Sequence, residues 1–250
     1  MKKKAIVTGG NQGIGKAIHD RLINLGYETV SWNKGAKVKG VKSVLVDLSI
    51  GSSAIVDAIE KTQKILGENF KLDVLVNNAG VCQAKKFEEI SEEDYDRIMD
   101  TNLKAMFFTS SFLLSWMKKG DNKNIASNII NISSISGLQG FTGHTHYCAS
   151  KFGVIGLTQS MAKELSTQGI AVNAVCPGPT QTPMWEALDK EYSAMNGWTG
   201  LETGEQKYFG KLLIKRIGDP SDVADAVEYL IKSKYSTGTA LTVCGGNILR

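Results

Sequence analysis

Tyr147 and Lys151 are the residues best suited to chemistry, because they stand four apart in the segment YCASK. On a helix, that spacing puts both side chains on one face, about 5–6 Å apart at Cβ. A phenol ordinarily titrates near pH 10 and is a poor acid or base at neutrality. An ammonium ~4 Å away would favour the phenolate by about 4 kcal/mol at an effective dielectric near 20, and would lower the pKa of the phenol. The pair therefore predicts a tyrosine that exchanges protons, although such pairs also occur on solvated helices.

A glycine-rich turn near the start offers a second kind of chemistry. The apolar run Ala5–Thr8 leads into Gly9-Gly10-Asn11-Gln12-Gly13-Ile14-Gly15, and a helical pattern follows. Glycines there allow a sharp turn, let a diphosphate approach main-chain N–H groups, and let the helix pack close to the strand. The spacing differs from the GxGxxG fingerprint of dinucleotide sites. A plain glycine-rich turn is the alternative, since the chain has 26 glycines, but the strand and helix on either side favour phosphate binding.

Length and composition exclude several classes of protein. The 250 residues are 42% hydrophobic and 22% charged, which suits one large catalytic domain over residues 1–250. No apolar run approaches the ~18–20 residues of a membrane span, and the lysine-rich start lacks the apolar segment of a signal peptide. We therefore expect a cytoplasmic protein. The net charge of +4 comes from scattered lysines, so nucleic-acid binding has little support.

The cysteines and histidines do not predict a metal site. The four cysteines are far apart and none forms a CxxC pair, and the three histidines lack the spacing of metal ligands on a helix. We expect free thiols in a reducing compartment and no bound metal.

Short apolar runs alternate with helical patterns along the chain, which indicates a parallel sheet covered by helices on both faces. We predict an α/β fold of the Rossmann-like, doubly wound kind with about seven parallel strands. The expected strands are Ala5–Thr8, Thr29–Trp32, Ser43–Val46, Val74–Asn77, Ile125–Ser133, Ala171–Cys176 and Leu241–Val243. The expected helices cover residues 14–25, 53–66, 92–118, 148–167 and 221–232.

The late segment 184–216 departs from this alternation, because it is rich in aromatic residues and interrupted by glycines. Long inserts of this kind are either lids over a substrate or contacts between subunits, and we favour a lid.

Taken together, the motifs resemble those of the short-chain dehydrogenase/reductase family. They stand in the family's order and extend through RIGDPSDVA (216–224) and TGTALTVCGG (237–246). The motifs are TGGNQGIG (8–15), NNAG (77–80), Asn102, INISS (130–134), YCASK (147–151) and PGPTQT (177–182). The resemblance implies hydride transfer between a nicotinamide coenzyme and a carbinol or carbonyl carbon, with no metal needed.

The resemblance also assigns catalytic roles. Tyr147 would exchange a proton with the substrate oxygen, and Lys151 would hold the nicotinamide ribose and lower the pKa of the phenol. Ser134 would polarise the carbonyl; Ser133 is its rival, but the family's interval of thirteen residues before the tyrosine selects Ser134. Asn102 would hold a water that links Lys151 to solvent.

A larger set of residues matches the family's coenzyme-binding positions. The set is Gly9, Asn11, Gln12, Gly13, Ile14, Gly15, Asn33, Lys34, Asp47, Leu48, Asn78, Ala79, Gly80, Tyr147, Lys151, Pro177, Gly178, Thr180 and Thr182. Asp47 would contact the adenine, although it could instead cap the helix that follows it.

The choice between NADP and NAD depends on the end of the second strand. An acid there would bind the ribose 2′-hydroxyl of NAD and repel a 2′-phosphate. This chain has Asn33 and Lys34 instead, which favours NADP. Gln12 opposes this reading, because NADP-binding relatives often carry Arg or Lys there, so NAD stays the alternative.

The substrate is the least determined feature. TPMWEALD (182–189) resembles bacterial acetoin/butanediol and polyol dehydrogenases, which implies a small hydroxyketone, diol or polyol. The short lysine-containing loop resembles 3-oxoacyl-carrier-protein reductases, so an acyl thioester is an alternative; a non-catalytic dinucleotide-binding module is another. Candidate substrate contacts are Ser134, Gln139, His144 and Trp185. From the resemblance we also expect a homotetramer or homodimer.

Overall fold

The computed structural model describes residues 2–35, 40–197 and 212–249. Within these residues, seven parallel strands form one sheet in the order β3-β2-β1-β4-β5-β6-β7. This arrangement confirms the predicted doubly wound fold. The strands are β1 (Lys4–Thr8), β2 (Glu28–Asn33), β3 (Ser43–Leu45), β4 (Val74–Asn77), β5 (Ser127–Ile132), β6 (Ile170–Pro177) and β7 (Ala240–Val243).

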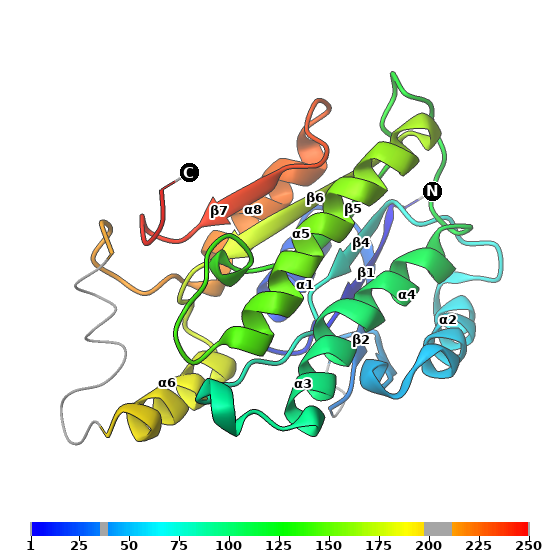
Figure 1. Ribbon diagram of the computed structural model, residues 1–250. Coiled ribbons are helices and arrows are strands. Elements are labelled where there is room, and N and C mark those ends of the chain that lie inside the picture. Colours follow the sequence, from blue (N-terminus) through cyan, green and yellow to red (C-terminus); the bar gives the residue numbers. More distant parts are fainter. Residues whose placement is uncertain (1, 36–39, 198–211, 250) are drawn as a thin grey trace.

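Helices cover both faces of the sheet (Figure 1). One face packs on α2, α4 and α5, and the other packs on α1 and α8. Successive residues of β1 show the division, because Ile6 belongs to the first core while Ala5 and Val7 belong to the second. The helices are α1 (Gly13–Asn24), α2 (Ser52–Leu66), α3 (Glu92–Met99), α4 (Ala105–Leu113), α5 (Thr145–Leu165), α6 (Pro183–Asn196) and α8 (Pro220–Lys232).

Two helices differ from their predicted bounds in ways that matter for the site. The single helix expected over residues 92–118 is α3, a π-helical turn at Asp100–Lys104, and α4. The extra residue in the turn accompanies Asn102, whose side chain bonds outside its own helix. Helix α5 starts at Thr145 rather than 148, so Tyr147 lies in its first turn.

The strand order creates a switch point between β1 and β4. From β1 the chain builds outwards to β3, then returns to pair β4 on the other side of β1. Loops leaving the carboxyl ends of β1 and β4 therefore diverge, which opens a crevice where ligands bind in folds of this kind.

A row of buried polar side chains ties the central strands to two helices. The Asn77 amide donates to Ser110 of α4 and to Asn131 of β5, both at 2.9 Å. Asn131 in turn donates to Thr158 of α5 at 2.9 Å. Because each bond lies in a dry interior, the row holds α4 and α5 in register with the carboxyl halves of β4 and β5.

Helix α6 lies beyond the carboxyl ends of the strands, on the side of the molecule away from the N-terminus (Figure 1). It forms the first part of the segment predicted to be a lid, while residues 198–211 of that segment lie outside the described residues. None of the helices described here combines the length and the apolar character that crossing a membrane would require.

Candidate active site

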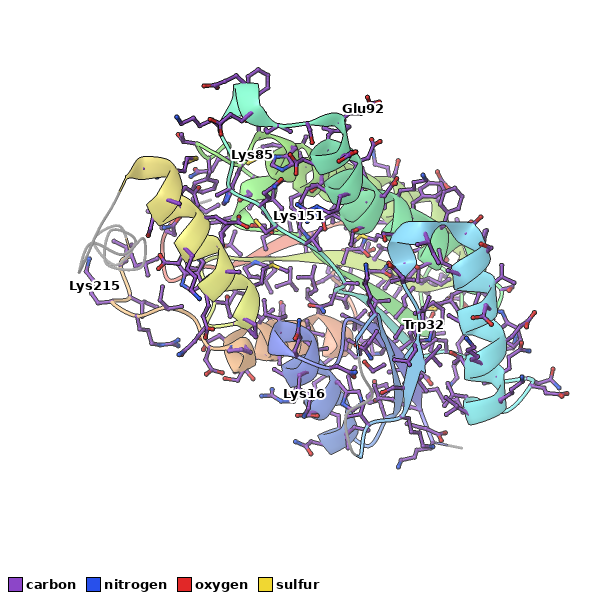
Figure 2. All side chains as sticks on the ribbon, turned by 90° about the horizontal axis from the view of Figure 1, so that it is seen from below. Lys16, Trp32, Lys85, Glu92, Lys151 and Lys215 are labelled. Carbon is purple, nitrogen blue, oxygen red and sulfur yellow. The ribbon has the colours of Figure 1, made fainter. Side chains whose placement is uncertain are left out.

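A cavity of about 710 Å³ lies at the carboxyl ends of the strands. Its wall includes every predicted coenzyme residue, from the glycine-rich turn to Thr182, together with Ser134, Tyr147 and Lys151. His144 and Trp185, two of the predicted substrate contacts, also line it. Lys151 is buried and lies near the middle of the molecule in the view from below, while Lys215 lies at the edge (Figure 2).

The glycine-rich turn has the shape of a phosphate cradle. Gly9 and Gly13 have positive φ angles of 68° and 51°, which residues with a side chain rarely adopt. A Cβ on Gly15 would lie only 2.1 Å from the Gly9 carbonyl oxygen. Helix α1 begins here without a side-chain cap on its first N–H groups and without an acid in its first turn. The turn therefore fits an anionic diphosphate, which helix N-termini favour.

The end of β2 is more closed than the sequence suggested. Asn33 is buried, and its amide donates to Asn11 Oδ1 at 2.8 Å and to Ser31 Oγ at 2.7 Å. The side-chain carbonyl oxygen of Asn33 accepts the backbone N–H of Asn11 at 3.0 Å. Asn33 thus holds the glycine-rich turn in place with both ends of its amide.

Lys34 is the exposed polar group at this end of the cavity. Its ammonium lies 2.7 Å from the Asp47 carboxylate. Asp47 also accepts bonds from Ser49 and so caps the 3-10 turn Leu48–Ile50, as one of the two sequence readings predicted. Because Lys34 is 76% exposed, the ion pair is weakly held and the ammonium can move to another anion.

Tyr147, Ser134 and Lys151 meet where β5 approaches α5. Ser134 lies beside the Tyr147 phenol, and hydrogen bonding from its side chain lowers the pKa of that phenol. The Lys151 ammonium lies 5.6 Å from the centre of the tyrosine ring. The ammonium donates to the Ile132 carbonyl at 3.0 Å. The Ser133 hydroxyl donates to the Lys151 carbonyl instead, at 3.0 Å, so Ser134 is the one of the two rival serines that affects the pKa of the phenol.

Burial changes the electrostatic balance expected for this pair. Desolvation raises the pKa of Tyr147 well above its ordinary value. Hydrogen bonding from Ser134 lowers the same pKa, but by less. Desolvation also lowers the pKa of Lys151 to about 8. The predicted lowering of the tyrosine pKa by Lys151 is therefore wrong for this structure, because desolvation is the largest cause at both groups. Tyr147 is therefore a neutral phenol at pH 7 and still carries its proton.

Asn102 shapes the loop after β4 rather than lining the cavity. Its side chain accepts the Val81 N–H at 2.8 Å and donates to the Val81 carbonyl at 2.9 Å and to Ser150 Oγ at 3.1 Å. These bonds anchor the segment after Gly80, which lies beside Lys151. Asn102 is thus a positioning residue, and its expected link to solvent through a water stays a prediction.

One predicted substrate contact is misplaced. Gln139 is exposed and does not belong to the cavity wall formed by the described residues. After β5 the chain makes the 3-10 turn Ile135–Gly137 and buries Leu138, which leaves the next side chain pointing to solvent. We therefore remove Gln139 from the candidate site.

Helix α6 closes the other end of the cavity. Thr182 caps the helix by accepting the Trp185 N–H at 3.2 Å, and its methyl group would lie 3.1 Å from a Cβ on Gly13. The lip of the phosphate cradle and the start of α6 are therefore in contact. Trp185 and Leu188 of α6 line the substrate end of the cavity.

Sequence reasoning missed several cavity residues. Cys82 and Phe141 line the substrate end, and Arg97 of α3 also reaches the cavity. Cys82 follows Gly80 by two residues at the switch point, so the rule for ligand sites in open sheets could have found it. Phe141 and Arg97 carry no local signal, because only tertiary packing brings them to the cavity.

Comparison with known proteins agrees with this geometry. Residues 3–193 match the model of a family described as short chain dehydrogenase. The chain belongs to this family. It is 36% identical to the L-2,3-butanediol dehydrogenase of Corynebacterium glutamicum, over 98% of both chains. It is 34% identical to a 3-oxoacyl-[acyl-carrier-protein] reductase of Staphylococcus aureus strain Mu50, again over 98% of both.

A solved structure gives the same result for the fold. The 4-hydroxyisoleucine dehydrogenase complexed with NADH superposes with a TM-score of 0.79 at 27% identity, covering 98% of this chain and 97% of that one. This protein is thus a short-chain NAD(P)-dependent dehydrogenase/reductase, and its cavity has the cradle that such a coenzyme requires.

The burial of His144 predicts that this dehydrogenase loses stability in acid. Burial lowers the pKa of His144 from 6.5 to about 4. Between these pH values the unfolded chain binds a proton at the imidazole and the folded chain does not. The free energy of unfolding therefore falls with falling pH, by up to about 3 kcal/mol for this group.

Urea denaturation of the parent and of His144→Phe, at pH ~7 and pH ~4.5, checks this expectation. The variant should lose less stability in acid than the parent does. Burial also lowers the pKa of His146, so some acid sensitivity should remain in both proteins. An identical loss in parent and variant would contradict the assignment to His144.

Proposed function

We propose that this dehydrogenase interconverts a secondary alcohol and a ketone on a small hydroxyketone or diol, with Ser134, Tyr147 and Lys151 as its catalytic residues. The observation that carries the proposal is that Ser134, the partly buried Tyr147 phenol and Lys151 stand together in the wall of one cavity, where the Ser134 side chain affects the pKa of the phenol. A phenolic O–H and a second hydroxyl at one point suit a single substrate oxygen.

Each catalytic residue has a separable part in the reaction. Tyr147 donates its phenolic proton to the carbonyl oxygen in reduction, or receives the alcohol proton in oxidation. Ser134 hydrogen-bonds the same oxygen and supports the negative charge that develops on it. Lys151 is an ammonium below its pKa of about 8, so its charge favours the phenolate that remains after proton transfer.

The coenzyme would occupy the rest of the cavity. The glycine-rich turn would hold its diphosphate, and the segment Asn78–Gly80 would lie along the sugar next to it. When bound, the nicotinamide supplies or accepts the hydride that changes the oxidation state of the substrate carbon.

The substrate end of the cavity favours a small and partly apolar molecule. Phe141, Trp185 and Leu188 supply apolar wall, while Ser134, Tyr147 and His144 supply polar groups. A four-carbon hydroxyketone or diol combines both characters. The similarity to L-2,3-butanediol dehydrogenase over the full length of the chain supports the same substrate class.

A 3-oxoacyl thioester is the second candidate. It is favoured by the 34% identity to a 3-oxoacyl-[acyl-carrier-protein] reductase. The same Tyr147 and Ser134 would act on its ketone. A binding module without chemistry, the third possibility drawn from the sequence, is not retained, because the chain belongs to an enzyme family and has all three catalytic side chains in the wall of one cavity.

For the coenzyme we infer NADP, with NAD as the alternative. The described end of β2 presents the Lys34 ammonium and no acid except Asp47, which is already paired with Lys34. A 2′-phosphate would therefore meet a cation that can leave a weak surface pair. Homo-oligomer formation stays a prediction from the family resemblance.

Replacement of Lys34 tests the coenzyme assignment. Lys34→Ala should lower kcat/KM for NADPH by about fivefold to tenfold and leave the value for NADH nearly unchanged, since only NADPH has the 2′-phosphate. Steady-state kinetics with both coenzymes at low and high salt measures the effect. A parent enzyme that prefers NADH, with no change in this ratio in the variant, would refute the choice of NADP.

Replacement of Tyr147 tests the catalytic assignment. Tyr147→Phe keeps the ring but removes the proton, so acetoin reduction by NADPH should fall by about a hundredfold or more. Tyr229→Phe is the matched control, because that side chain is exposed and outside the cavity wall. Turnover in Tyr147→Phe equal to that of the control would disprove the role of Tyr147. Parallel assays with a 3-oxoacyl thioester decide between the two substrate classes.

A further inference from the structure

His144 occupies a distinctive place next to Tyr147. It is 5% exposed, lines the cavity, and its ring centre lies 5.5 Å from that of Tyr147. On its other side it packs edge to face against Tyr192 of α6, with ring centres 4.9 Å apart. A polar ring held this rigidly beside the proton donor can contact a second atom of the substrate.

The hydrogen bonds around His144 decide which ring nitrogen carries the proton. The Tyr192 hydroxyl donates its only proton to the Thr142 carbonyl at 2.7 Å, since a carbonyl can only accept. Its oxygen can therefore only accept from His144 Nδ1, at a long 3.5 Å. This favours the tautomer with the proton on Nδ1, in which the Nε2 lone pair is an acceptor.

The neighbour of Nε2 is a weak partner. Cys82 Sγ lies 3.9 Å from this nitrogen, and Cys82 also lines the cavity. Burial raises the pKa of the Cys82 thiol to about 12, so it remains an S–H group. A thiol donates only weakly. A substrate hydroxyl could displace this contact at little cost.

We propose that His144 recognises a hydroxyl group on the carbon next to the reacting carbon, by accepting its hydrogen bond at Nε2. The inference rests on the function proposed above and narrows its substrate to vicinal diols and their hydroxyketones. A diketone or a thioester carbonyl offers only acceptor atoms at its second oxygen, so it cannot make this bond. Burial also lowers the pKa of His144 to about 4, which keeps the acceptor free at neutral pH.

The decisive experiment compares two alcohols that differ in one hydroxyl. kcat/KM is measured with the oxidised coenzyme for butane-2,3-diol and for butan-2-ol, in the parent and in His144→Phe. The variant retains an aromatic ring against Tyr192 but has no acceptor. Its kcat/KM for the diol should fall by about tenfold or more, while the value for butan-2-ol should change by less than about threefold.

Two further variants separate recognition from packing. His144→Gln can place a carbonyl oxygen near the position of Nε2, whereas the shorter His144→Asn reaches only the position of Nδ1. The preference for the diol should be kept better in His144→Gln than in His144→Asn. Thermal denaturation of each variant confirms that it is folded.

A spectroscopic measurement tests the proton assignment without turnover. The ¹⁵N resonances of His144 are identified as those present in the parent and absent in His144→Phe. They should show a protonated Nδ1 and an unprotonated Nε2. The Nε2 resonance should move when butane-2,3-diol is added with the coenzyme. The opposite tautomer, or an equal loss for both alcohols in His144→Phe, would overturn the inference. Neither result would affect the role of Tyr147. That role is tested separately by Tyr147→Phe, which should also lose turnover of butan-2-ol, an alcohol without the second hydroxyl.

Discussion

The removal of the Lys151 ammonium from water is the constraint on which the site depends. A buried cation needs a fixed partner, and the Ile132 carbonyl at the end of β5 provides one at 3.0 Å. That bond requires α5 to lie close against β5. Gly137 makes the approach possible, since a Cβ there would be 2.5 Å from the Lys151 carbonyl oxygen. The same approach brings Ser134 to the Tyr147 phenol, so the three side chains are positioned by one packing contact.

The rest of the sheet supplies the space next to this contact. Parallel strands with a switch point leave the loops after β1 and β4 diverging. The buried row from Ser110 through Asn77 and Asn131 keeps the ends of β4 and β5 in place. Asn102 then holds the loop after Gly80 through two bonds to the backbone of Val81. The π-helical turn around it interrupts the helical ladder to direct that side chain to the loop. Polar groups inside the protein thus define the shape of the cavity as much as its apolar walls do.

The two ends of the cavity make different demands on a ligand. Near β2, glycines, amides and the exposed Lys34 favour a charged and well-solvated group, whose binding should depend on salt. Near α6, a thiol, a neutral imidazole and aromatic rings favour a small molecule with few polar atoms. The Tyr147 phenol stands at this second end, where burial keeps its proton in place until a substrate oxygen takes it. We therefore expect separate sets of residues to govern the choice of coenzyme and the choice of substrate.

Local chemistry in the sequence was enough to predict the strands, the glycine-rich turn between β1 and α1, and the proximity of Tyr147 and Lys151. Each of these depends on residues a few positions apart. It could not decide between Ser133 and Ser134 by contact, place Gln139 in solvent, or find Phe141 and Arg97. It also expected Lys151 to lower the pKa of Tyr147, whereas burial raises it. These features depend on which segments pack against one another and on how much water remains between them. Desolvation and long-range contact are properties of the folded chain, so only the tertiary structure could decide them.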